Sequence, residues 1–114
     1  MNNILTSIKK MLGIDDPSFT AFDGEIMVFI NTAFGKLTQI GVGPSQGYAI
    51  STGNETWDNY ETNIIVQEMA KTFVYQNVRL LFDPPSNSFL QKAIEDQIAE
   101  LTWRLNVQVD PGGN

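Results

Sequence analysis

The sequence contains no histidine and no cysteine in its 114 residues. Histidine is the usual proton shuttle near neutral pH, and both residue types are common nucleophiles or soft metal ligands. Their absence removes the usual parts of most catalytic sites. It also excludes a disulfide framework, which fits a reducing compartment.

Basic residues are few as well. Seven Lys and Arg stand against thirteen Asp and Glu, which gives a formal net charge of -6. Tight binding to nucleic acid needs cations that neutralise phosphates, so the charge argues against a nucleic-acid-binding protein.

Long hydrophobic runs are also lacking. The longest, residues 26–30, is far shorter than the roughly 20 residues of a membrane span. Lys9 and Lys10 interrupt the apolar opening stretch, which predicts an amphipathic helix and not a secretion signal. We therefore expect a soluble cytoplasmic chain with no membrane partner. Its length predicts a single domain over residues 1–114.

Apolar residues recur at helical spacing in four segments, at about residues 4–12, 23–40, 62–82 and 87–106. Pro84 and Pro85 cannot continue a helix, so the third segment should end near Phe82 and the chain should turn back. The predicted fold class is an all-α bundle of about four helices. The candidate N-caps are Asn2 or Asn3, Asp23, and Ser86 or Asn87.

The wide apolar arc of the third segment is typical of a central helix in a small bundle. Leu90 and Leu105 are expected to face the bundle from the fourth segment, and Trp57 is expected to close one end of the core as a lid. The predicted core includes Ile30, Phe34, Phe73, Leu81, Ile94, Ile98 and Leu101.

Two segments are predicted to be irregular. Residues 41–56 hold four of the nine glycines, and only Tyr48, Ala49 and Ile50 could form a short strand. A long excursion of this kind is either functional or a mobile surface loop, and both interpretations remain open. Residues 106–114 are predicted to form a flexible or docking C-terminal arm.

Two helix faces look suited to partners. The second predicted helix carries small, nearly uncharged residues opposite its apolar stripe. In the fourth, Phe89 and Trp103 project into the charged face, and aromatic residues away from a core are enriched at protein interfaces. Alternatively, Trp103 folds down over the charged stems or under the C-terminal tail. The candidate interface residues are Trp103, Phe89, Arg104, Asn31, Gly35, Tyr48, Ile50, Val107 and Val109.

No catalytic or cofactor-binding motif is present. The sequence has no P-loop, dinucleotide glycine pattern, nucleophile elbow or zinc-ligand spacing. Asp96 and Glu100 share a helix face and could hold a hard cation, as in a carboxylate metalloenzyme. Lys92 and Arg104 bracket them, however, which favours a ladder of solvated ion pairs. We predict a non-enzyme without cofactor or metal.

Four stretches carry a resemblance that covers nearly the whole chain in order. They are ILTSIKKMLGI, FINTAFGKLTQIGVGP with the tryptophan that follows it, VRLLFDPPSNSF and QIAELTWRLNVQVDP. Together they resemble the small head-to-tail connector proteins of tailed bacteriophages and prophages, also called head completion or adaptor proteins. None of these stretches is a catalytic signature, and the family has no catalytic residues to transfer.

The resemblance implies a helical structural protein that forms a ring of about twelve copies on the portal. Such a ring joins the DNA-filled head to the tail, extends the DNA channel and helps retain packaged DNA. The implied partners are other copies of the chain, the phage portal protein and a downstream connector or tail protein. Double-stranded DNA would pass without specific binding. The implied location is the head-tail interface of the virion, after assembly in the cytoplasm of the bacterial host.

A rival interpretation is a small acidic helical regulator that binds and masks a cytoplasmic protein. Ring closure separates the two functions. A masking module should be a monomer or dimer of fixed size, whereas a connector should form large rings, alone or upon meeting a portal.

Overall fold

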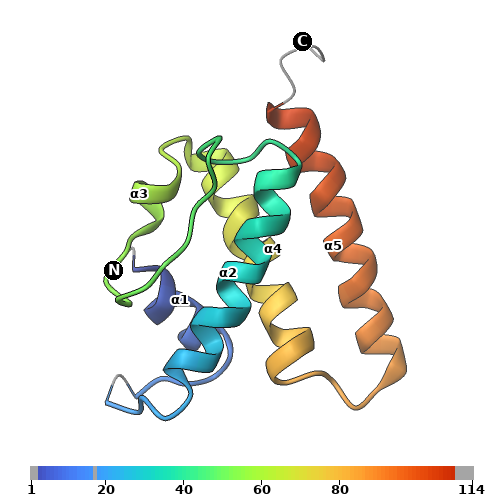
Figure 1. The fold of residues 1–114 in the computed structure, drawn as a ribbon. Coiled ribbons are helices and arrows are strands. Elements are labelled where there is room, and N and C mark those ends of the chain that lie inside the picture. Colours follow the sequence, from blue (N-terminus) through green and yellow to red (C-terminus); the bar gives the residue numbers. More distant parts are fainter. Residues whose placement is uncertain (1–2, 17, 110–114) are drawn as a thin grey trace.

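The computed structural model describes residues 3–16 and 18–109. Within these residues the protein forms helices and no strand, which confirms the all-α prediction. The short strand that residues 48–50 could have formed is absent. No helix of this described part is long and apolar enough to cross a membrane. The helices are α1 (Ile4–Met11), α2 (Asp23–Gln39), α3 (Trp57–Tyr60), α4 (Ile64–Phe82) and α5 (Ser88–Val109) (Figure 1).

Several predicted helix ends are confirmed by their local chemistry. The Asn3 side chain caps α1 by accepting a hydrogen bond from the Thr6 amide, and the Asn87 side chain accepts from the amides of Phe89 and Leu90 at the start of α5. Helix α4 ends at Phe82, one residue before the two prolines, as predicted. Helix α5, in contrast, continues to Val109, so the segment predicted as an arm is helical up to that residue, and its remainder lies outside the described residues.

Asp23 was predicted to cap α2, and this was wrong. Phe22 occupies the N-cap position without a side-chain cap bond. The carboxylate of Asp23 instead lies 2.8 Å from the ammonium of Lys9, which is buried and also donates to the carbonyl of Phe19 at 2.7 Å. A buried lysine needs such partners, so Asp23 fastens α1 to the start of α2.

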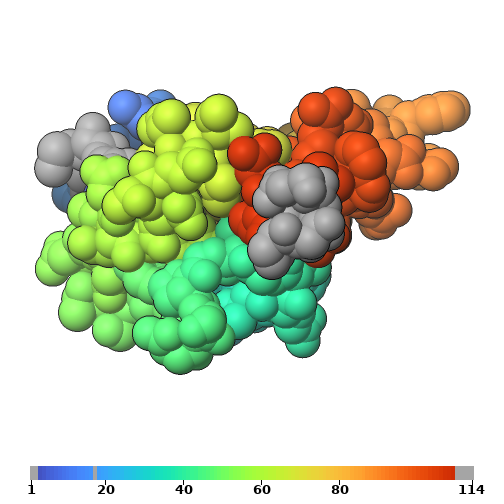
Figure 2. Space-filling view, turned by 90° about the horizontal axis from the view of Figure 1, so that it is seen from above, coloured from blue at the N-terminus to red at the C-terminus, as the bar shows by residue number. Residues whose placement is uncertain are grey.

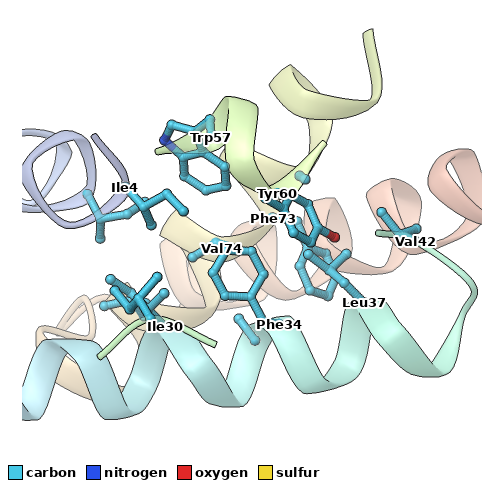
Figure 3. Close-up of a cluster of buried hydrophobic side chains, with 14 of the residues drawn as sticks. Ile4, Ile30, Phe34, Leu37, Val42, Trp57, Tyr60, Phe73 and Val74 are labelled. Carbon is cyan, nitrogen blue, oxygen red and sulfur yellow. The ribbon is translucent and has the colours of Figure 1, made fainter. Parts of the chain in front are cut away.

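Helix α4 occupies the centre of the bundle, with α2 and α5 packed against it and α1 and α3 also in contact with it. In Figure 3, Phe34 rises from α2 toward Val74 and Trp57, and Leu37 rises from the same helix toward Phe73 and Tyr60. Trp57 is fully buried, and its indole N–H donates to the hydroxyl of Ser7 at 2.8 Å. Trp57 therefore belongs to the core and is not an exposed docking residue.

The predicted core is correct except at the α4–α5 corner. Ile30, Phe34, Phe73 and Ile94 are buried, and Ile98 and Leu101 are partly buried against the same cluster. Leu81, which was predicted to be buried, is 53% exposed, and Leu90 is 54% exposed although it was expected to face the bundle. Leu81 lies in the last turn of α4 and Leu90 in the first turn of α5, where the two helices stand apart (Figure 1).

The glycine-rich segment 41–56 is packed against the core rather than projecting from it. Val42 and Ile50 are buried, and the ring of Tyr48 makes edge contacts with Phe34 and a tilted contact with Tyr60. Gly43 has a φ of 81°, and a Cβ at this position would overlap the Tyr60 ring. Here glycine is required both by backbone conformation and by close approach.

The end of this segment is organised by the carboxylate of Glu55. It accepts hydrogen bonds from the amides of Ser51, Thr52 and Gly53 at 2.8, 3.2 and 3.0 Å. Partial burial acts to raise the pKa of Glu55, but the combined amide and hydroxyl donors outweigh it and lower the pKa to about 2. The Ile4 amide donates to the Glu55 carbonyl, so this turn also holds the start of α1.

Candidate functional site

Helix α5 buries little of its surface. Of its 22 residues only Ile94 and Leu105 are buried. At 100° per residue, Trp103 points away from the side on which Ile94 lies. The Trp103 side chain is accordingly 67% exposed, and Phe89 is 86% exposed. Two large aromatic side chains thus stand in solvent on a helix whose other side faces the core, an arrangement typical of a contact surface.

Four charged residues follow Phe89 along α5 at four-residue steps, and they form two ion pairs within the helix. Lys92 lies 3.1 Å from Asp96, and Arg104 lies 2.8 Å from Glu100. The predicted ion-pair ladder is confirmed. Exposed pairs of this kind contribute only about 0.3–0.5 kcal/mol each, so they can exchange partners at little cost. We call the exposed residues on this side the outer face of α5: Phe89, Lys92, Asp96, Glu100, Trp103 and Val107.

A shallow hollow of about 300 Å³ borders the outer face near its C-terminal end. Trp103 and Val107 line it from α5, and Ile65 and Met69 line it from the first turns of α4. Ile65 is 58% exposed although its place in the apolar arc of α4 had suggested burial. Ile64 beside it is 61% exposed, and both residues lie in the first turn of α4.

The outer face is accessible because α5 lies at one edge of the molecule (Figure 1). Seen from above, the start of α5 projects beyond the other helices (Figure 2). In the described residues, two side-chain hydrogen bonds join α5 to other elements, and neither involves a residue of the outer face. Gln76 of α4 donates to the Gln97 side chain, and the Asn106 side chain donates to the Ile40 carbonyl at 3.3 Å.

Three of the predicted interface residues serve the chain's own fold. The Asn31 side chain donates to the Ile50 carbonyl at 2.9 Å and accepts from the Ile50 amide at 2.8 Å. Ile50 is buried, and Tyr48 packs on Phe34 as described above. The loop at residues 41–56 thus covers part of the uncharged face of α2 within the same chain. Asn31, Tyr48 and Ile50 are therefore not part of the partner surface that we propose.

The other predicted residues occupy different positions. Arg104 and Val107 lie beside Trp103, whereas Val109 packs partly buried against the core. Gly35 is exposed on α2, and apart from its chain neighbours and the nearby backbone of its own helix no atom lies within 4 Å of the position that a Cβ would take there. Val28 and Thr32 share that side of α2, and Val28 is 60% exposed. The structure therefore leaves two separate exposed helix faces, one on α5 and one on α2.

The described residues contain no group of three His, Cys, Asp or Glu side chains that could hold a metal ion. Comparison with known proteins finds no matching curated protein and no matching solved structure. A family model described as phage connector protein, in contrast, matches residues 4–112, almost the entire chain. The chain belongs to the phage connector protein family.

Proposed function

We propose that this chain is a structural virion protein whose copies form a ring beneath the portal and join the DNA-filled head to the tail. Membership of the phage connector family supports a structural connector role. The observation that carries the ring is the outer face of α5. It presents Trp103, 67% exposed, on the side of the helix opposite its own core.

A ring joint is head-to-tail, so it needs two different patches on each subunit. The outer face of α5 is one, and the exposed side of α2 is the other. That side holds Val28, Thr32 and Gly35, and the exposed charges of Glu25 and Lys36 border it. A glycine inside a helix costs about 1 kcal/mol relative to alanine, and Gly35 has no neighbour within the chain that requires it. An approaching helix or indole from the next subunit would require it.

The acidic balance of the chain suits a DNA channel. With a net charge of -6, the ring would offer few cations to phosphates, so DNA could slide through without adhering. A closed acidic ring beneath the portal would extend the channel and help to retain DNA once a tail protein occupies its lower side.

The test is to measure the mass of the purified chain by light scattering, with and without the portal protein. We expect ring-sized complexes when the portal is present. A chain that keeps the mass of a monomer or dimer at every portal concentration would fit a masking regulator and would rule out the connector ring.

Two substitutions address the joint itself. Trp103→Ala should weaken ring formation by about 2 kcal/mol or more, as expected for an interface hot spot. Gly35→Leu should block it by filling the space on α2. Met11→Ala, which removes an exposed apolar side chain from α1, is the matched control and should leave ring formation unchanged. Normal rings from both joint variants would show that these faces are not the joint.

A further inference from the structure

We propose that the free chain, before it meets a portal, pairs with a second copy of itself through the outer faces of two antiparallel α5 helices. This inference concerns the chain before assembly and does not depend on the ring. It stands on the order of side chains along the outer face and on the accessibility of that face at the edge of the molecule (Figure 1).

The order of side chains is complementary to itself when the direction is reversed. Let a twofold axis pass beside Asp96. Phe89 and Trp103 lie at equal distances on either side of it, about 10 Å at a rise of 1.5 Å per residue. Phe89 of each copy is then level with Trp103 of the other. Lys92 and Glu100 are also equally spaced, about 6 Å from the axis, so each lysine meets a glutamate of the second copy.

Charge and aromatic pairing together select this register over its neighbours. A shift by one helical turn in one direction would place Lys92 level with Arg104 and Asp96 level with Glu100, which sets like charges against each other. A shift in the other direction would place Phe89 level with Ala99, so the aromatic pairs would be lost. A parallel pairing in register would oppose identical charges along the whole face. The axis beside Asp96 avoids all three defects.

The register has one unfavourable contact, because the two Asp96 side chains meet at the axis. Each keeps its own Lys92 at 3.1 Å, which reduces the repulsion. The remaining contacts are favourable. Two aromatic pairs leave water, and aromatic pairs contribute beyond the area they bury. The pairing would also cover Trp103 and Phe89, the same side chains that we assign to the ring joint, so the dimer would have to open before the chain joins a ring.

The test uses the full chain without a portal, in sedimentation velocity at concentrations up to about 100 μM. We expect a dimer that Lys92→Glu and Glu100→Lys each weaken at least about tenfold. The double variant K92E/E100K restores the pairing between copies and should recover much of the dimer. Lys10→Glu makes the same charge change on α1, away from the outer face, and should leave the dimer unchanged.

Asp96→Asn should change the affinity of the dimer in the opposite direction from the charge-reversal variants. It removes the repulsion at the axis, so it should strengthen the dimer, although it also breaks an ion pair within the helix. A wild-type chain that is monomeric throughout, or a dimer indifferent to all of these charge changes, would overturn the proposal. Circular dichroism establishes that each variant is helical.

If the charge variants fail to fold, cysteine pairing provides an independent measurement, because the chain has no native cysteine. With oxidised glutathione added, a mixture of the Phe89→Cys and Trp103→Cys chains should give disulfide-linked heterodimers, and Phe89→Cys alone should not link. The reverse pattern would refute the antiparallel register. None of these results bears on the ring, which is tested separately with the portal present.

Discussion

Helices α1 to α4, together with the loop at residues 41–56, bury their apolar residues in one shared cluster, whereas α5 contributes little to it. Leu105 is the only residue of α5 fully inside that cluster, with Ile94 buried nearby. We call the first region the α1–α4 block. The difference suggests that the block carries most of the stability of the fold, while α5 is attached along one side and presents the other side to partners.

Polar contacts follow the same division. Inside the α1–α4 block, the buried Gln67 side chain donates to the Asp58 carboxylate at 2.9 Å and to the Glu61 carbonyl at 2.8 Å. Lys36 of α2 donates to the Asn77 side chain of α4 at 3.0 Å. Each of these bonds satisfies a buried group and fixes two elements relative to each other. The ion pairs of α5 lie within the helix and fix nothing beyond it.

The largest effect should come from Phe34→Ala, which would break the α1–α4 block. Phe34 is fully buried and its ring contacts those of Tyr48, Trp57 and Tyr60. Its truncation leaves a cavity, so we expect a loss of about 3–5 kcal/mol in the free energy of unfolding. Urea denaturation followed by circular dichroism measures this loss. A loss below about 1 kcal/mol would mean that the cluster is not the centre of stability.

Leu105→Ala should have the next largest effect, about 2–3 kcal/mol, because Leu105 is the fully buried anchor of α5. Val107→Ala on the same helix is the matched control. Val107 is 49% exposed and should cost less than about 0.5 kcal/mol. Hydrogen exchange distinguishes local from global effects. In the Leu105 variant the amides of α5 should exchange faster while those of α2 and α4 keep most of their protection. Equal loss in all helices would show that α5 is integral to the block.

The core of the α1–α4 block could be predicted from the sequence better than the corner between α4 and α5. Apolar spacing located α2 and α4 because burial imposes the helical period on residues such as Ile30, Phe34 and Phe73. Leu81 follows the same helical spacing of apolar residues, but it lies at the end of α4, where the chain leaves the bundle. The spacing alone does not show how far along α4 the neighbouring helices extend. Aspartate is a favourable N-cap residue, but the Asp23 carboxylate binds Lys9 instead. This contact depends on how α1 and α2 pack in three dimensions, which the sequence alone does not show.

The candidate site was predictable where it depends on one helix and unpredictable where it depends on two segments. The exposure of Trp103 and Phe89 follows from their angular position on α5 relative to Ile94. Asn31, in contrast, lies on a face that looks free until the loop at Ile50 returns to it. The hollow beside Ile65 likewise exists only because α4 and α5 are neighbours.

A smaller loss should follow from Gly43→Ala. Its φ of 81° disfavours any side chain, and the added Cβ would overlap the buried Tyr60 ring. We expect a loss of about 1–3 kcal/mol in the free energy of unfolding. Gly35→Ala is the matched control, and it should change the free energy of unfolding in the opposite direction. Gly35 is helical and has free space around it, so alanine should stabilise the chain by about 0.5–1 kcal/mol. Equal effects at both glycines would contradict the packing described for the loop.

The turn at residues 51–55 should weaken in acid. The pKa of Glu55 is lowered from 4.5 to about 2. Its contribution to stability is therefore fully present above about pH 4.5 and is lost as the pH falls toward about 2. The effect is modest because the carboxylate is partly exposed. Amide exchange of Ser51, Thr52 and Gly53 should accelerate over this range relative to α4 amides. Glu55→Gln should remove the pH dependence, and its persistence would assign the effect to another carboxylate.

Trp103→Ala should have the smallest effect on the isolated chain, within about 0.5 kcal/mol of the wild-type free energy of unfolding. Trp103 is 67% exposed, so its removal leaves no cavity in the core. The chain has two tryptophans, one in each of the compared regions, which allows a direct optical check. In Trp103→Phe, the remaining Trp57 should emit at short wavelength and resist acrylamide, because it is fully buried. In Trp57→Phe, the remaining Trp103 should emit at longer wavelength and be quenched readily at low protein concentration, where copies are separate. Its emission should shift to shorter wavelength when copies associate. A shielded Trp103 in the dilute monomer, or a large loss of stability on its removal, would place it in the fold and erase the distinction between α5 and the α1–α4 block.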